Sequence, residues 1–350
     1  MNRTESIDGV LDTDKLSRWM RDAGLGEGPI EEAVQLTGGT QNILVRFRYA
    51  GRDLVLRRPS LRAPSNRNAL ILREAKVLHA LRDTSVPHAR LVAACADEEV
   101  LGGAVFYIMD AVDGFNPAEE LPAGLSDYRA RERMSMDATD ALAAIGALDY
   151  VAIGLDGFGK PEGFLERQVA RWVGERDSYL AMDNYDGAPL PGFASIRDYL
   201  AENVPRSYRV GLIHGDYHFG NLLFDRESAD MVAVLDWEMS TIGDPLMDFG
   251  RYLAMWPDEH EVIIDTGAIW GSGPLPTCET LIERYVQKSG ADTEYLHWYI
   301  LMGCFKLGII LEGTYARSCA GLAPEHVGKL LHDTAVRLFD RGCRLIGAAP

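Results

Sequence analysis

The stretch LIHGDYHFGNLLFD, residues 212–225, has a cluster of polar side chains between two apolar ends, and its interpretation decides the fold that we predict. His214, Asp216, His218 and Asn221 stand within eight residues of one another. Such a segment is either a crowded turn whose side chains satisfy nearby backbone groups or a site of chemistry. The segments that follow it along the chain bear on the choice.

Two short apolar runs, LLF (222–224) and VAVL (232–235), are separated by DRESAD and predict a β-hairpin. A hairpin on that turn brings Asn221 and Asp236 to its open end, with Asp216 on the loop that enters it. Two carboxylates and an amide oxygen suit a hard cation such as Mg²⁺, whereas the thiolates and paired histidines of zinc sites are missing. Each of these side chains taken alone is explained as a turn cap, but three converging at one hairpin favour a metal or phosphate role.

Composition excludes several classes of partner. The 350 residues carry a formal net charge of −17, from 35 Lys and Arg against 52 Asp and Glu. A chain with no basic excess is not expected to bind nucleic acid or an anionic membrane. The five cysteines are scattered and form no C-x-x-C pair, so we expect neither a disulfide framework nor a zinc site.

Two stretches are candidate signals for a membrane, and neither is convincing as one. MNRTESIDGVLDTDK lacks the apolar core of a signal peptide. LHWYILMGCFKLGIIL (296–311) is interrupted by Lys306 and is shorter than a membrane span, so it predicts a buried helix. A cytoplasmic protein is expected, and the sequence leaves the oligomeric state undetermined.

The chain divides by pattern into a β-rich part and a helical part. Residues 1–111 predict a small lobe: a helix at 11–24, strands at 31–36, 42–49, 54–58, 90–97 and 104–110, and a helix at 65–83. Residues 112–350 predict a larger lobe with helices at 126–150, 163–181, 195–203, 245–255, 277–289, 293–313 and 324–344. The fold class is therefore α+β, with an antiparallel sheet in the first lobe, and the cleft between two lobes is a natural ligand site.

Two features of the small lobe have open interpretations. Glu74 shares the inward side of its helix and needs a partner, for which Arg57 on the neighbouring strand is a candidate; alternatively Glu74 lies at the edge of the apolar stripe and pairs with nothing in particular. TGGTQN (37–42) lies between two strands. Its adjacent glycines let a backbone approach a phosphate, and they equally make an ordinary hairpin turn.

Taken in this order, the segments resemble the bilobal protein-kinase-like fold, in its aminoglycoside phosphotransferase branch. HGDYHFGN resembles the catalytic loop H-G-D-x-x-x-x-N of that branch, and LDWEMSTIGDPLMDFG (235–250) resembles its metal-binding segment. GKPEGFLERQVARW (159–172) and FYIMDAVDG (106–114) are similar to the kinase-like domains of acyl-CoA dehydrogenase family members 10 and 11 and to their free-standing bacterial relatives.

The resemblance implies roles for the polar loop. Asp216 would be the catalytic base, and Asn221 and Asp236 would hold Mg²⁺ against the nucleotide phosphates. His218 would donate a hydrogen bond near the γ-phosphate, or else be a surface loop histidine. His214 would brace the loop from below.

The resemblance also implies a nucleotide site and two bracing carboxylates. Asp244 and Asp248 would hydrogen-bond backbone amides rather than bind ligands. Arg57 stands where kinases carry a lysine, which keeps the charge but changes the geometry. The nucleotide-binding residues implied are Gly38, Gly39, Thr40, Val55, Arg57, Glu74, Met109, Asp110 and Val112.

The expected activity is Mg²⁺-dependent transfer of the γ-phosphate of ATP to a hydroxyl of a small molecule, with a hydroxyacyl-CoA or hydroxy acid as the acceptor that the resemblance implies. Arg167 and Arg171, four residues apart on one helix, could meet an anionic acceptor, or could belong to an exposed helical face with Trp172 in the core. Two alternatives remain: a kinase of aminoglycosides or of other drugs, amines or sugars, and a catalytically weak nucleotide-binding module.

Overall fold

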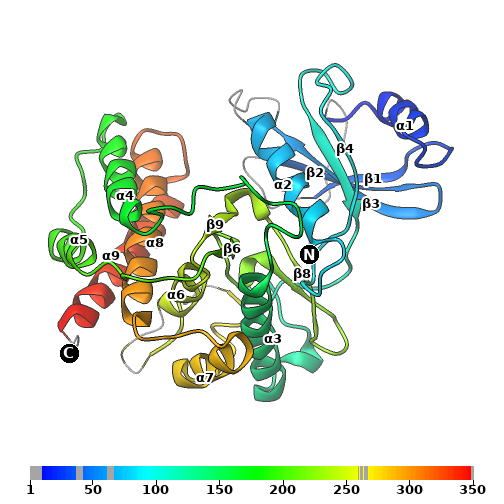
Figure 1. Cartoon of the computed structure of the whole chain (residues 1–350). Helices are drawn as coiled ribbons and strands as arrows, with labels where there is room; N and C mark the ends of the chain where they lie inside the picture. Colours follow the sequence, from blue (N-terminus) through cyan, green and yellow to red (C-terminus); the bar gives the residue numbers. More distant parts are fainter. Residues whose placement is uncertain are drawn as a thin grey trace. The chain divides into compact units, whose positions relative to one another are not determined.

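The computed structural model describes residues 10–36, 42–60, 67–258, 260, 263 and 267–347, and its helices and strands are labelled in Figure 1. The chain divides into two compact units. Unit 1 contains residues up to Gly114 together with Val232–Glu238, and unit 2 contains Phe115–Met231 and the residues from Met239 onward. The division of function at residues 111 and 112 stays a prediction.

Unit 1 is built on an antiparallel sheet of five strands in the order β1-β2-β3-β5-β4. The strands are β1 (Glu31–Leu36), β2 (Asn42–Tyr49), β3 (Arg52–Pro59), β4 (Leu91–Cys95) and β5 (Phe106–Asp110). The β2–β3 hairpin turns at Ala50 and Gly51, which both have positive φ (48° and 77°), as the tightest hairpin turns require. The helices are α1 (Thr13–Asp22), capped by the Asp12 carboxylate, and α2 (Arg67–Leu81).

The alternating pattern of β3 separates two environments. Leu54 and Leu56 pack into the cluster that also contains Leu16 and Met20 of α1. Val55 and Arg57 point to the other face, which α2 covers (Figure 1). The period of two therefore places the buried guanidinium of Arg57 on the helix-covered face of the sheet.

Unit 2 is mostly helical, as the sequence predicts. Its helices are α3 (Tyr128–Ala147), α4 (Glu166–Ser178), α5 (Phe193–Glu202), α6 (Leu246–Ala254), α7 (Cys278–Ser289), α8 (Leu296–Cys319) and α9 (Glu325–Gly347). Strand β6 (Gly211–Ile213) pairs antiparallel with β9 (Thr241–Gly243). Strand β7 (Leu222–Phe224) follows the polar loop. The unit boundary falls within β8 (Met231–Val234): Met231 belongs to unit 2, and the strand's remaining residues belong to unit 1.

Helix α8 is the central element of unit 2. It packs against α6 and α9 (Figure 1) and contributes Trp298, Leu301 and Phe305 to an apolar cluster that also contains buried side chains of α4, α5 and α9. Its length and composition alone would allow it to cross a membrane, but 67% of its most apolar window is buried within the protein. This burial is typical of a core helix, in agreement with the sequence prediction, and the cytoplasmic location stays a prediction.

Candidate functional site

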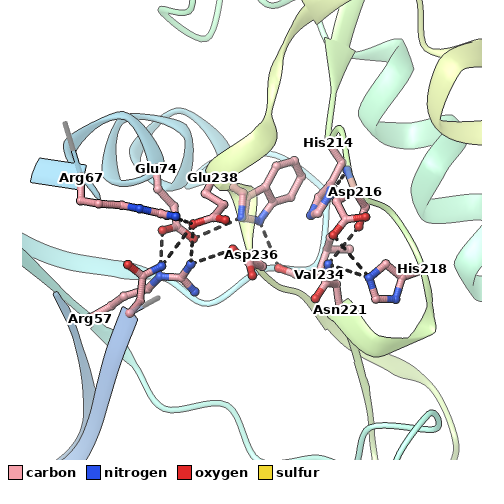
Figure 2. A network of polar contacts seen from close by, with 12 residues as sticks. Arg57, Arg67, Glu74, His214, Asp216, His218, Asn221, Val234, Asp236 and Glu238 are labelled. Atoms are coloured by element: carbon pink, nitrogen blue, oxygen red, sulfur yellow. Dashed lines mark hydrogen bonds and ion pairs between the residues drawn. The ribbon is translucent and has the colours of Figure 1, made fainter. Parts of the chain in front are cut away.

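In unit 1, Arg57 lies at the centre of three carboxylates (Figure 2). Its Nε is 3.0 Å from Oε2 of Glu74 on α2, and its Nη2 is 2.7 Å from Oδ1 of Asp236 and 3.6 Å from Oε2 of Glu238. The contact with Glu74 lacks the alignment of a hydrogen bond and is an ion pair. Both partners are buried, with side chains 8% and 2% exposed. The structure thus brings together Arg57 and Glu74, which the sequence had left as an open pair.

Burial and neighbouring charge act in opposite directions on Glu74. The pKa of Glu74 is raised to about 7 in total: burial raises it most, the Arg57 guanidinium lowers it, and the carboxylates of Asp236 and Glu238 raise it. Burial alone would lower the pKa of Arg57, but the charges of Glu74 and Asp236 more than offset this and raise it. The arginine is therefore always charged, and it is the group that allows three acids to lie close together.

Asp236 combines an ion pair with an unusual backbone. Its φ is 61°, in the left-handed region that non-glycine residues rarely adopt. Such conformations cost about 1–3 kcal/mol and cluster at functional sites, where surrounding contacts hold them. Here the neighbouring Trp237 N–H donates to Glu74 Oε1 at 3.2 Å, which fixes the segment against α2. The side chain of Asp236 remains 38% exposed, so it is open to a ligand.

Glu238 is a residue that the sequence analysis did not single out. Its Oε2 accepts a hydrogen bond from Asn42 Nδ2 at 3.2 Å and lies 3.5 Å from Arg67 Nη1. It thereby ties the start of β2 and the start of α2 to the Arg57 cluster. The sequence shows an acidic residue two positions after Asp236, but nothing in the sequence indicates which side chains Glu238 would contact.

The expected nucleotide-facing residues of unit 1 lie on adjacent strands. Val55 on β3 pairs directly with Met109 on β5, and both are buried. The N–H of Asp110 donates to the Arg90 carbonyl at 2.9 Å. Val112 follows the strand and is half-buried. Gly38, Gly39 and Thr40 lie outside the described residues.

In unit 2, the polar loop after β6 is held from within by carboxylates, as expected. Asp248 on α6 accepts the backbone N–H groups of His214 and Gly215, the second at 2.9 Å. Asp244 accepts from the N–H of Leu246 at 3.0 Å and from the Tyr299 hydroxyl. The bracing role predicted for both acids is confirmed.

Gly215 has a conformation that only glycine fits. Its φ is 88°, and a Cβ there would lie 2.3 Å from the Met239 carbonyl oxygen. The buried ring of His214 accepts the N–H of Asp216 at 3.3 Å through Nδ1, which confirms its predicted bracing role. The H-G-D sequence thus fixes the direction in which Asp216 leaves the loop.

Asp216 is surrounded by nitrogen donors. His218 Nε2 and Arg251 Nη2 each lie 3.5 Å from one of its carboxylate oxygens. Burial opposes ionisation of Asp216, but its side chain is still 35% exposed, and the hydrogen bond from His218 with the charges of Arg251 and Lys306 holds its pKa well below the ordinary value. Asp216 is therefore an ionised carboxylate at neutral pH.

His218 and Asn221 lie beside Asp216 (Figure 2). His218 Nδ1 accepts the N–H of Gly220 at 3.1 Å, so a neutral ring carries its proton on Nε2, which lies 3.5 Å from Asp216 Oδ2 and 3.3 Å from Asn221 Nδ2. Asn221 Nδ2 donates to the Asp216 carbonyl at 2.9 Å. Its amide oxygen is the atom left for a ligand. In this arrangement His218 orients Asp216, and its predicted contact with a γ-phosphate stays a prediction.

The environment of Asp216 contains cations that sequence analysis missed. Arg251 on α6 is buried, and Lys306 on α8 is 9% exposed and donates to the Gly215 carbonyl. Lys306 Nζ also lies 5.4 Å from the ring centroid of Trp172, over which the Arg171 guanidinium stacks at 5.0 Å. By contrast Arg167 donates to the carbonyls of Glu162 and Lys160, which favours a structural role for it.

The residues present fit a magnesium ion in their chemistry. Asn221 offers an amide oxygen and Asp236 a partly exposed carboxylate, and Mg²⁺ in nucleotide sites takes one or two such donors, completing its shell with phosphate oxygens and water. Within the described ranges, no group of three or more His, Cys, Asp and Glu side chains could hold a metal ion by itself. Asp216 and Asn221 belong to unit 2 and Asp236 to unit 1, so their convergence stays a prediction.

Comparison with known families and curated proteins gives consistent results. Residues 32–296 match the phosphotransferase enzyme family, APH. Acyl-CoA dehydrogenase family member 10 of Mus musculus is 31% identical over 323 residues, which cover 89% of this chain and 29% of that protein. Family member 11 of Homo sapiens is 30% identical over 254 residues, covering 71% of this chain and 31% of that protein. The chain thus spans about a third of the length of these relatives.

Solved structures confirm the α+β, kinase-like fold. A Ralstonia eutropha protein provisionally named an aminoglycoside phosphotransferase superposes with a TM-score of 0.76 at 30% identity, covering 95% of this chain and 98% of that one. Aminoglycoside phosphotransferase APH(4)-Ia, solved in a ternary complex with AMP-PNP and hygromycin B, gives a TM-score of 0.64 at 16% identity, with 96% and 99% covered. At that identity the second likeness shows the fold alone.

Proposed function

We propose that this chain, which belongs to the phosphotransferase enzyme family, transfers the γ-phosphoryl group of ATP to a hydroxyl group of a small molecule. The observation that carries the proposal is Asp216. Its carboxylate is kept ionised by His218, Arg251 and Lys306, on a loop that Asp248 fixes through two backbone hydrogen bonds. A fixed, ionised and partly exposed carboxylate is what the orientation of an acceptor hydroxyl requires.

In the proposed reaction, the acceptor oxygen forms a bond to the γ-phosphorus. The bond from that phosphorus to the oxygen bridging the β- and γ-phosphates breaks, and ADP leaves with its electron pair. Asp216 orients the hydroxyl and receives its proton. Arg57 neutralises charge on the phosphate oxygens, and Glu74 positions Arg57.

Asn221 and Asp236 are the proposed protein ligands of Mg²⁺, which when bound neutralises charge on the phosphate oxygens. Val55 and Met109, paired on adjacent strands, are proposed to contact the adenine, and the carbonyl of Asp110 and the N–H of Val112 to meet its edge. The turn containing Gly38, Gly39 and Thr40 is proposed to cover the phosphates.

For the acceptor, the names of the relatives favour an acyl-CoA-related compound, either a hydroxyacyl-CoA or a hydroxy acid. The second candidate is an aminoglycoside, since structural neighbours carry that name. A catalytically weak nucleotide-binding module is the third, and Arg57 in place of lysine is the feature that favours it. We propose no nucleic acid or membrane partner.

The experiment compares an aspartate variant in the polar loop, Asp216→Asn, with one in the turn that follows β7, Asp225→Asn. Asp216→Asn is expected to lower kcat about 10²- to 10⁴-fold with the affinity for Mg·ATP retained. Asp225→Asn is the control, because Asp225 Oδ1 accepts hydrogen bonds from the N–H groups of Glu227 and Ser228, which an asparagine oxygen also does. ADP release and phosphate transfer are followed over hydroxyacyl-CoA, hydroxy acid, aminoglycoside and sugar acceptors.

Nucleotide binding is measured first, as a rise in melting temperature with Mg·ATP. Full turnover of Asp216→Asn would remove the assignment of the base. A protein that binds Mg·ATP but phosphorylates no acceptor in the panel would be the weak nucleotide-binding module.

A further inference from the structure

Lys306 is the charged residue that interrupts the apolar run of α8, and the fold takes it into the interior of unit 2. It is 9% exposed, between neighbours Phe305 and Leu307 that are 0% and 4% exposed. Its ammonium donates to the carbonyl of Gly215, the residue that directly precedes Asp216. A buried lysine is costly to keep, so its place next to the loop calls for an explanation in terms of the site.

Hydrogen-bond donors outnumber acceptors around this ammonium. Lysine has three N–H donors, and within the described part of the chain Gly215 is the acceptor found for Lys306. Trp172, 5% exposed, has a buried Nε1–H with no acceptor there, and so does Nε of Arg251. A buried donor left without an acceptor costs about 1–3 kcal/mol, so such a cluster is suited to a ligand that brings acceptors.

The charges point the same way. Lys306, Arg251 and Arg171 face two carboxylates, Asp216 and Asp248. Asp248 is already engaged by two backbone N–H groups. Burial lowers the pKa of Lys306 to about 8; the two carboxylates oppose the shift, and the two arginines add to it. Around the Lys306 ammonium, these three cations thus outnumber the two carboxylates, although the whole chain carries a net charge of −17.

We propose that Lys306 and Trp172 bind an acyl oxygen of the acceptor, the carboxylate of a hydroxy acid or the carbonyl of its thioester, beside the hydroxyl that Asp216 orients. An acyl oxygen accepts hydrogen bonds and donates none, which matches the Lys306 ammonium and the Trp172 Nε1–H. An aminoglycoside brings ammonium groups, which the cations would repel. The inference rests on the proposed phosphotransferase function and assigns its acceptor specificity to these two residues.

The test uses the full chain and four probes: β-hydroxybutyrate, its coenzyme A thioester, the diol in which a hydroxymethyl group replaces the carboxylate, and kanamycin. Trp172→Phe keeps the aromatic ring under Lys306 and removes the Nε1–H. It is expected to raise KM for the acid and the thioester about tenfold, the equivalent of one hydrogen bond, and to leave KM for the diol unchanged. Lys306→Met should remove the preference for the acid over the diol.

Lys288→Met is the matched control, because Lys288 on α7 pairs with Asp140 and has a side chain 43% exposed. An equal loss with the diol and the acid in Trp172→Phe, or a wild-type preference for kanamycin, would overturn the inference. A loss confined to the acid with no loss for the thioester would identify the carboxylate as the source of the oxygen, and the reverse would identify the thioester.

Calorimetric titration of the four probes, without nucleotide, separates this inference from the function on which it rests. If no phosphate is transferred to any probe, the proposed function fails. Tight binding of the acid or thioester that Trp172→Phe weakens would then still support the subsite, and its absence would overturn it.

Discussion

Replacing Arg57 by lysine tests how the buried acids of unit 1 are held. The guanidinium reaches Glu74 through Nε at 3.0 Å and Asp236 through Nη2 at 2.7 Å. A lysine ammonium is one nitrogen and cannot occupy both positions. We expect it to stay with Glu74, which is 2% exposed, and to give up Asp236, whose side chain is 38% exposed and can return to water.

The magnitude follows from which contact is lost. A buried hydrogen bond to a charged group contributes about 1.5–3 kcal/mol, and partial exposure of Asp236 places the loss near the lower end, at about 1.5 kcal/mol. Arg57→Met removes the cation altogether and leaves buried Glu74 without its counter-charge, for which about 3 kcal/mol is expected. The predicted order of stability is wild type, Arg57→Lys, Arg57→Met.

The assay is urea unfolding followed by tryptophan fluorescence, with Trp19 and Trp237 reporting on unit 1. Arg58→Lys is the control: Arg58 is 2% exposed, but its Nε and Nη2 have no partner among the described residues. We expect a smaller loss for Arg58→Lys than for Arg57→Lys, because the described residues give Arg58 no carboxylate partner to lose. Equal stabilities of Arg57→Lys and Arg57→Met, or an equally large loss in Arg58→Lys, would refute the reasoning that the carboxylates of unit 1 depend on the Arg57 charge.

Two further predictions concern α6 and α8. Gly250→Ala is expected to destabilise unit 2 by about 3 kcal/mol in urea unfolding, because the new Cβ would lie 2.4 Å from the Tyr299 backbone. The control is Gly174→Ala in α4, where the new Cβ would meet no atom within 4 Å and the change should be neutral or slightly stabilising. Similar losses of stability in the two variants would contradict the predicted clash with Tyr299. Because burial lowers the pKa of Lys306 from 10.5 to about 8, the unfolded chain binds more protons there between these pH values, and the stability contribution of Lys306 rises with pH across that window. Unfolding free energies measured from pH 7.5 to 10.5 should therefore rise less steeply in Lys306→Met, and identical slopes would show that burial does not lower the pKa of Lys306.

Local patterns predicted the features that depend on neighbours in sequence. The alternation in β3 predicts Val55 and Arg57 on one face, and helical spacing favoured the inward side of α2 for Glu74 but left open whether it had a partner. The bracing role of Asp248 followed from the resemblance of its segment to a known one. In each case the orientation of the side chain follows from the strand, helix or segment on which it lies, and the sequence pattern predicts that element.

Features that depend on tertiary packing were not predicted. Lys306 was interpreted only as an interruption of an apolar helix, because its acceptor, the Gly215 carbonyl, lies 91 residues away. The contacts of Glu238 with Asn42 and Arg67 were also missed, because these residues are far from Glu238 in the sequence. The helix expected at 293–313 continues to Cys319, since Glu312 and Ala316 are buried by contacts that periodicity does not reveal.

The electrostatics of Asp216 constrain how it acts in the proposed reaction. A carboxylate whose pKa is held well below its ordinary value is a weak base, so it cannot remove a proton from an alcohol before bond formation begins. In a loose transition state, the acceptor oxygen becomes acidic only as its bond to phosphorus forms. Asp216 would therefore contribute mainly by orienting the hydroxyl and would take the proton late. If Lys306 binds an acyl oxygen of the acceptor as proposed, one of the cations that lower the pKa of Asp216 also favours an acceptor rich in oxygen.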